Sequence, residues 1–83
     1  MRRVFVNPPS KEKAQLAFGA AMRSFREARQ LTQEGLAERA DLHTTYVSSV
    51  ERGERNLSLH NIARIAYALG VPPSELMRCL DPS

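Results

Sequence analysis

Four hydroxyl side chains lie close together near the middle of this chain, in the stretch TQEGLAERADLHTTYVSSVERG that runs from residue 32 to residue 53. They are Thr44, Thr45, Ser48 and Ser49. Threonine and serine are mediocre helix formers and poor core residues, but a hydroxyl can both donate and accept a hydrogen bond. Their spacing predicts one face of a short helix that contacts a polar partner.

Two short helices with a break near Asp41 must position these hydroxyls. Thr32 is the expected cap of a helix over residues 33–40, and the hydroxyls belong to a second helix from Thr44 to Arg52, ended by Gly53. Two helices that cross steeply need apolar residues where they meet and a small residue where their backbones approach. The residues that meet this need are Leu36, Ala37, Ala40, Leu42, Val47 and Val50. Residues 33–52 are therefore predicted to form a helix-turn-helix.

The rest of the chain predicts an all-α bundle. Residues 1–9 form a short arm that ends in the breaker Asn7-Pro8-Pro9, and residues 10–83 form one domain. Ser10 caps a helix over residues 11–30, Ser58 caps a helix that reaches Leu69, and Pro73 starts a fifth helix that ends at Leu80. Apolar residues recur on one face of the first and fourth helices, and Leu16 and Leu59 are counted among the core-facing positions.

Charge favours a polyanionic partner. The net charge is +3, and residues 1–30 hold seven Arg or Lys against two Glu, whereas residues 31–83 hold five Arg against seven Asp or Glu. A basic half of this kind is typical of proteins that bind polyanions, although a solvated helix face is the simpler alternative.

The remaining composition excludes several classes of protein. One cysteine, Cys79, excludes an internal disulfide and favours a reducing cytoplasm, and no apolar run approaches the length of a membrane span. His43 and His60 are too isolated to form a metal site or a Cys–His nucleophile with Cys79. We expect neither an enzyme nor a protein with a cofactor, a metal or a small-molecule ligand.

Three segments are similar to a known family. FGAAMRSFREARQLTQEGLAERA, YVSSVERGERNLSL and IARIAYALGVPPSELM resemble the phage-repressor/Cro type helix-turn-helix proteins, also called the xenobiotic-response-element (XRE) type. The second segment and the short chain most resemble controller proteins of restriction–modification systems. The resemblance implies a five-helix lambda-repressor-like DNA-binding domain whose third helix enters the major groove, and hence a transcription regulator, either repressor or activator.

The resemblance and the chemistry of each side chain together predict the DNA contacts. Helix starts and hydroxyls in the major groove can contact base edges, and a helix N-terminus with amide or cationic side chains can bind phosphates. The predicted base contacts are Thr44, Thr45, Ser48, Ser49 and His43. The predicted phosphate contacts are Gln33, Tyr46, Arg52, Arg55, Asn56 and Arg23. Arg26 and Glu51 match a pair that usually joins the first and third helices in the family, so both are predicted to be structural.

The expected partners are double-stranded DNA and a second copy of the chain. Leu76, Met77 and Leu80 are the predicted dimer surface, and a contact with RNA polymerase stays open. The main alternative is an antitoxin-type interaction module of the same fold, in which DNA binding is secondary. The arm does not decide between them, because Arg2 and Arg3 suit DNA whereas Val4, Phe5 and Val6 suit a protein partner.

Overall fold

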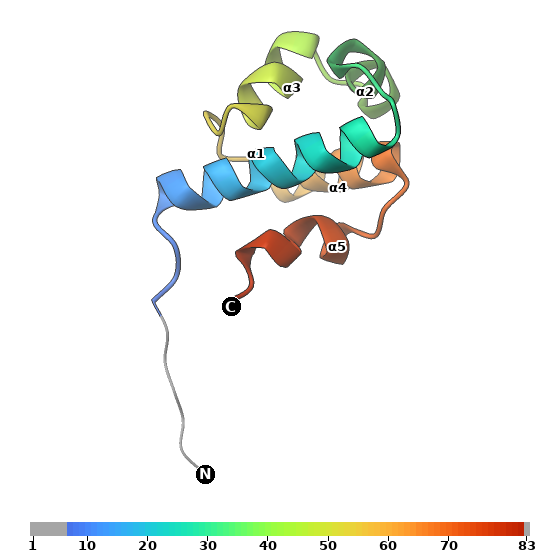
Figure 1. Cartoon of the computed structure of the whole chain (residues 1–83). Helices are drawn as coiled ribbons and strands as arrows, with labels where there is room; N and C mark the ends of the chain where they lie inside the picture. The colour runs from blue at the N-terminus through green and yellow to red at the C-terminus, as the bar shows by residue number, and fades with distance from the viewer. Residues whose placement is uncertain (1–6, 83) are drawn as a thin grey trace.

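The computed structural model describes residues 7–82, so the predictions for Arg2 to Val6 lie outside the described residues. Within that range the chain is all-α, with no strand (Figure 1). The helices are α1 (Lys11–Ala28), α2 (Gln33–Ala40), α3 (Thr44–Glu51), α4 (Leu59–Leu69) and α5 (Pro73–Met77), followed by the 3-10 turn η1 (Arg78–Leu80). The predicted five-helix fold is confirmed.

Three helices begin at the hydroxyl caps expected from the sequence. The side chain of Ser10 accepts a hydrogen bond from the Lys13 amide at 3.2 Å. Thr32 does the same for the Gly35 amide at 2.9 Å, starting α2. Ser58 starts α4 in the same way. Each such cap stabilises its helix by about 1 kcal/mol, because it satisfies an amide that has no partner inside the helix.

The helix ends differ more from prediction. α1 ends at Ala28 rather than Gln30, because Gln30 adopts φ 57° and the Leu31 amide bonds back to the Arg26 carbonyl at 3.2 Å. This left-handed turn brings Leu31 back to pack against the core. The last residues predicted for the fifth helix form η1 instead.

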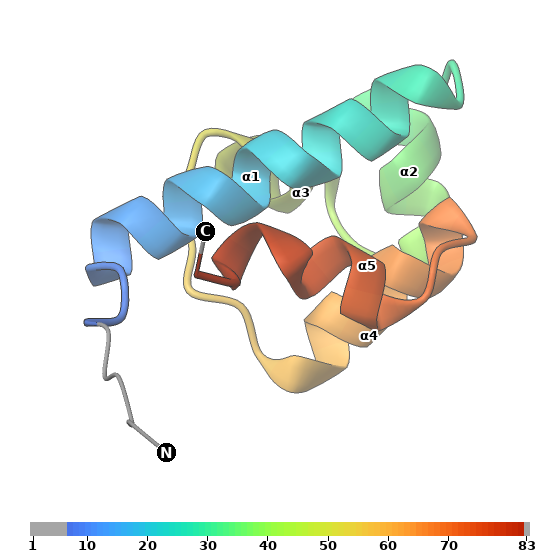
Figure 2. The ribbon, with the colours of Figure 1, turned by 60° about the horizontal axis from the view of Figure 1, so that its bottom comes forward.

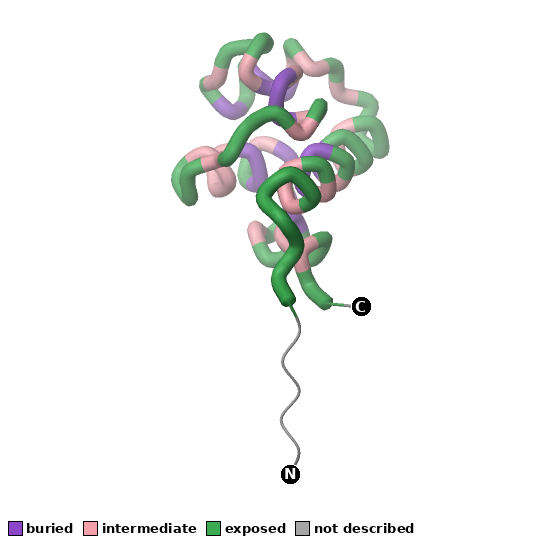
Figure 3. Tube along the Cα trace, turned by 90° about the vertical axis from the view of Figure 1, so that its left-hand side faces the viewer, coloured by how far each residue is buried: buried purple, intermediate pink, exposed green. Residues whose placement is uncertain are grey.

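α1 crosses the middle of the molecule, with α2 and α3 on one side and α5 on the other (Figure 1). Seen from below, α5 lies between α1 and α4 (Figure 2). The buried core is formed where these helices meet (Figure 3). Its fully buried large side chains are Met22, Leu36, Val47, Val50, Ile65 and Leu76. Val47 and Val50 anchor the inner face of α3, so its outer face points away from the bundle.

Two apolar residues predicted to face the core are exposed. Leu16 is 57% exposed and Leu59 is 85% exposed. Leu16 instead lies against Gly53, whose φ of 78° shapes the loop after α3. Leu59 is the first residue of α4, where the helix has not yet reached the core.

Gly19 permits the close crossing of α1 and α3. A Cβ atom at this position would lie 2.4 Å from the Val50 carbonyl oxygen and 2.7 Å from that of Glu51. No side chain fits at such distances, so any larger residue would push α3 away from α1. The position of α3 therefore depends on a glycine that the sequence analysis did not single out.

Candidate nucleic-acid interface

The turn between α2 and α3 is built without glycine. Asp41 adopts the left-handed conformation at φ 56°, which Asp tolerates better than most residues. The Leu42 amide then bonds to the Ala37 carbonyl at 2.9 Å and closes the end of α2. Asp41 thus holds the left-handed backbone conformation that glycine adopts most readily.

The start of α3 and its outer face expose most of the predicted base contacts. His43, Thr44 and Thr45 are exposed, and Ser48 is half-buried. His43 is the cap residue of α3, but its side chain makes no capping hydrogen bond. The outer surface of α3 therefore presents hydroxyls and the open N-terminus of the helix.

Ser49 does not belong to this surface, so its prediction as a base contact is corrected. Its side chain is 5% exposed. The hydroxyl donates to the Tyr46 carbonyl at 2.8 Å and accepts from Arg55 Nε at 3.0 Å. Ser49 is one residue beyond Ser48, and this rotation along the helix turns it inward. Its role is to hold Arg55.

Arg55 is oriented by side chains of α3. Besides its bond to Ser49, the guanidinium lies 5.6 Å from the centroid of the Tyr46 ring, within cation–π distance. The Tyr46 hydroxyl accepts a hydrogen bond from Asn61 Nδ2 at 3.1 Å. Arg55 itself is exposed, as is the neighbouring Asn56. A cation is thus held at the surface directly after α3.

Arg52 makes a second set of contacts at the end of α3. Its Nε and Nη2 atoms each donate to the Glu54 carboxylate at 3.1 Å, and Nη1 donates to the Ser48 hydroxyl at 2.9 Å. The hydrogen bonds between Arg52 and Glu54 raise the pKa of Arg52 and lower the pKa of Glu54 from their ordinary values. Because the Ser48 oxygen accepts from Arg52, its own O–H proton stays available to another acceptor.

A buried ion pair joins α1 to α3 as predicted. Arg26 donates to the two carboxylate oxygens of Glu51 at 2.6 and 3.0 Å, and the two side chains are 11% and 3% exposed. The hydrogen bonds that Arg26 donates to Glu51 raise the pKa of Arg26. Arg26 also donates to the Leu31 carbonyl at 2.8 Å, so the same guanidinium holds the α1–α2 turn.

Gln33 joins the same cluster. Its Nε2 atom donates to Glu51 Oε1 at 3.0 Å, and the residue is half-buried. One amide hydrogen is thereby used inside the protein, while the second Nε2 hydrogen and the backbone N–H groups of Gln33 and Glu34 remain for the predicted phosphate contact. Through Arg26 and Gln33, Glu51 thus fixes the α1–α2 turn and the start of α2 relative to α3.

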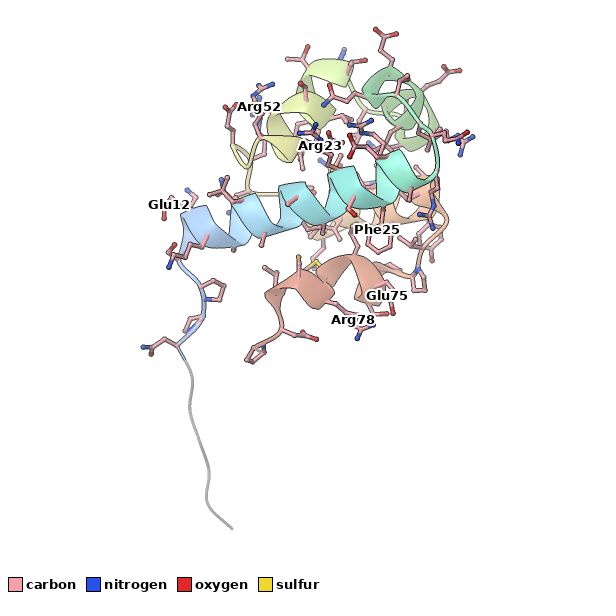
Figure 4. All side chains as sticks on the ribbon, in the orientation of Figure 1. Glu12, Arg23, Phe25, Arg52, Glu75 and Arg78 are labelled. Carbon is pink, nitrogen blue, oxygen red and sulfur yellow. The ribbon has the colours of Figure 1, made fainter. Side chains whose placement is uncertain are left out.

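Arg23 lies one turn after Gly19, next to the side of α1 that contacts α3 (Figure 4). It is exposed and pairs with Glu27 at 3.3 Å. An exposed pair of this kind contributes little to stability, and Glu27 contacts Arg23 through Nε alone.

Comparison with known proteins matches this architecture over most of the chain. The model of the helix-turn-helix family (HTH_3) matches residues 22–76, which run from the middle of α1 to α5. The chain belongs to the helix-turn-helix family.

Within the family, this helix-turn-helix protein is similar to restriction–modification controllers. The control protein C.BamHI of Bacillus amyloliquefaciens is 49% identical over 63 residues, which are 75% of this chain and 78% of that protein. The controller C.AhdI of Aeromonas hydrophila has a TM-score of 0.74 at 47% identity, over 75% of this chain and 94% of that one. The controller C.Esp1396I, solved as a tetramer with its natural 35 base-pair operator, has a TM-score of 0.74 at 28% identity, over 81% and 88%. The predicted resemblance is confirmed.

The predicted dimer surface of this helix-turn-helix protein needs a correction. Leu76 is 0% exposed and belongs to the core of its own chain, so it cannot meet a partner. Met77 and Leu80 are half-buried. Among the described residues, large apolar side chains are also exposed on α4, where Leu59 and Tyr67 are 85% and 78% exposed.

Three contributors to this site were missed from the sequence. Gly19, Glu54 and Gln15 position α3 or the residues that follow it; Gln15 Nε2 donates to the Gly53 carbonyl at 3.0 Å. An acidic residue two positions after Arg52 was a visible signal for the Glu54 pair. Nothing in the spacing of Gln15 and Gly19 indicated which face of α1 would meet α3.

The described part of the chain holds neither a candidate membrane span nor a candidate metal site. None of its helices is long and apolar enough to cross a membrane. No three of its His, Cys, Asp or Glu side chains are grouped so that they could hold a metal ion.

Proposed function

We propose that this protein is a cytoplasmic transcription regulator of the restriction–modification controller type, which binds a twofold-symmetric operator as a homodimer. The observation that supports this most is the construction of α3. Its inner face is anchored by Val47 and Val50, whereas its outer face presents hydroxyls beside an oriented Arg55. A helix supported in this way suits the major groove.

The exposed side chains divide into two kinds of contact. Thr44, Thr45 and Ser48 lie where the start of a recognition helix meets base edges, and a threonine methyl group can also pack on the methyl group of thymine. Because the Ser48 oxygen already accepts from Arg52, Ser48 acts as a donor toward N7, O6 or O4 acceptors. His43 is placed at the edge of the same surface.

Phosphate contacts surround these base contacts. The N-terminus of α2 at Gln33 offers backbone N–H groups, and the loop after α3 offers Arg55 and Asn56. Tyr46 contributes chiefly by supporting Arg55 and bonding to Asn61. These groups determine where the protein lies on the duplex, while the hydroxyls determine which sequence it prefers.

A homodimer is the natural form for such a regulator, because a twofold-symmetric operator needs two recognition helices at a fixed spacing. The apolar side chains of α4 favour this assembly. Leu59 and Tyr67 lie two turns apart on one side of the helix, and Tyr67 borders an open hollow formed by residues 70–73. Met77 and Leu80 remain candidates at the other end of the bundle. The transcriptional response then depends on the concentration of the protein and on cooperative binding of its dimers to DNA. A contact with RNA polymerase is a second means by which the protein would act on transcription.

Selection of bound sequences from random duplex DNA tests the proposal. We expect a twofold-symmetric motif with half-sites about 34–36 Å apart, or a multiple of that spacing. Thr44→Ala should degrade the motif, whereas Ser74→Ala, an exposed hydroxyl on α5, should leave it unchanged. Absence of any enriched sequence would contradict the proposal and favour the antitoxin-type interaction module.

A further inference from the structure

Arg52 is an exposed cation with three of its five N–H donors already occupied. Its guanidinium binds the Glu54 carboxylate through Nε and Nη2 and the Ser48 hydroxyl through Nη1. The Arg52 and Glu54 side chains are 54% and 57% exposed. Figure 4 shows Arg52 projecting from the end of α3, on the opposite side of α1 from α5. This surface is the one assigned to DNA above.

The Glu54 carboxylate binds Arg52 in the same two-point geometry that a DNA phosphate would use. A guanidinium binds a carboxylate and a phosphate alike, through two parallel N–H groups on one edge. Of the five N–H donors of Arg52, three are used by Glu54 and Ser48, which leaves two. A phosphate that approaches Arg52 must therefore displace Glu54 or bind the two N–H groups that remain, beside the negatively charged Glu54 carboxylate.

We propose that Glu54 is a specificity-determining residue that competes with the DNA backbone for Arg52. The inference rests on the proposed function, and it refines the prediction that Arg52 is a simple phosphate contact. With Glu54 in place, the pair is neutral and adds no net attraction to any duplex. Binding then depends more on the base contacts of α3, and nonspecific DNA is held less tightly.

Electrostatics supports this role. Attraction to phosphates is independent of the DNA sequence and supplies essentially all nonspecific affinity. An acidic side chain inside the contact surface therefore reduces the nonspecific affinity more than the specific one. The charge of Glu54 also lowers the attraction due to neighbouring Arg55, whose positive charge helps to lower the pKa of Glu54. Since the pKa of Arg52 is raised and that of Glu54 is lowered, both stay charged at neutral pH.

Glu54→Gln tests the proposal through the salt dependence of binding. We expect this variant to bind random-sequence DNA several-fold more tightly at low salt, with a slope of log K against log salt about one unit steeper. The ratio of operator to random-sequence affinity should fall. Arg52→Gln alone leaves Glu54 unpaired and should weaken binding to random-sequence DNA, whereas in the Glu54→Gln background it should remove the added unit.

Glu75→Gln is the matched control. It removes the same charge from an exposed Arg–Glu pair, with Arg78, on α5 at the far side of α1 from α3 (Figure 4). Its slope should stay close to that of the wild type. Equal slopes for Glu54→Gln and the wild type on random DNA would overturn the inference while leaving the proposed function intact. If the wild-type protein bound no DNA at all, the proposed function and this inference would fall together.

Discussion

Neighbouring side chains on α3 have opposite surroundings, and their roles differ accordingly. Thr45 is exposed, with no hydrogen bond that would restrain it, whereas Ser49 is buried and bonded on both its donor and acceptor sides. The spacing of hydroxyls predicted a polar helix, and the helix was found. The spacing did not show that Ser49 faces inward, because that depends on how Arg55 folds back from the next loop.

Thr45→Ala and Arg55→Ala should affect DNA binding in different ways. Loss of a good base contact at Thr45 should reduce discrimination between operator variants by roughly 1–3 kcal/mol. Loss of Arg55 should weaken binding to all sequences alike and reduce the salt slope by about one unit. Titrations on operator, mutated operator and random DNA measure both effects. If the two variants behave the same on every duplex, the division into base and phosphate contacts is wrong.

At the scale of the helices, boundaries set by local capping were predicted correctly, whereas features set by tertiary contacts were not. Hydroxyl caps at residues 10, 32 and 58 gave correct helix starts, because capping is decided by neighbours in the sequence. α1 ended two residues early because its end is set by contacts of Arg26 and Leu31 with distant elements. The crossing at Gly19 was also invisible, since it depends on which helix lies opposite.

Gly19→Ala should destabilise the protein even though alanine is the better helix former. The new methyl group would meet the Val50 carbonyl of α3, and overpacking of this kind typically costs about 1–3 kcal/mol. The neighbouring Ala20 is exposed, so Ala20→Gly should cost only the helix-propensity difference, about 1 kcal/mol. Denaturant melts compare the two. A Gly19→Ala variant as stable as the wild type would show that α3 can move away freely.

Arg26→Met should be far more damaging than Arg23→Met. The first substitution leaves the nearly buried Glu51 carboxylate without its main partner, a change that costs about 3–5 kcal/mol in buried pairs. The second breaks the exposed pair with Glu27, which contributes about 0–1 kcal/mol. Urea unfolding at neutral pH measures both. Similar losses in the two variants would mean that the Arg26–Glu51 pair is not the main link between α1 and α3.

For the whole molecule, fold and family were predictable, whereas the division of apolar side chains between core and surface was predicted only in part. In a bundle this small, an apolar residue belongs either to the core or to an interface, and hydropathy alone does not separate the two. Leu76 was assigned to an interface but completes the core, whereas Leu59 was assigned to the core but is exposed. Their places follow from the position of α5 between α1 and α4.

If the proposed homodimer forms through α4, Tyr67→Glu should shift it from dimer to monomer. The exposed Tyr67 borders the hollow of residues 70–73, and a charge there would have to be buried in a partner interface. Sedimentation at micromolar concentration measures the change, and the melting temperature at low concentration checks that the monomer stays folded. Met77→Glu is the companion variant. If it alone dissociates the dimer, the interface lies at α5 rather than α4.

The uncapped start of α3 has a consequence for hydrogen exchange. Because the His43 side chain bonds to no amide, the first backbone N–H groups of α3 have only solvent as a partner in the free protein. Their protons should exchange quickly with deuterium, whereas those bonded within the helix exchange slowly. A bound duplex that covers this end of α3 should slow exchange at Thr45 and Tyr46. Deuterium uptake at each of these two amides therefore reports whether the start of α3 lies in the DNA groove.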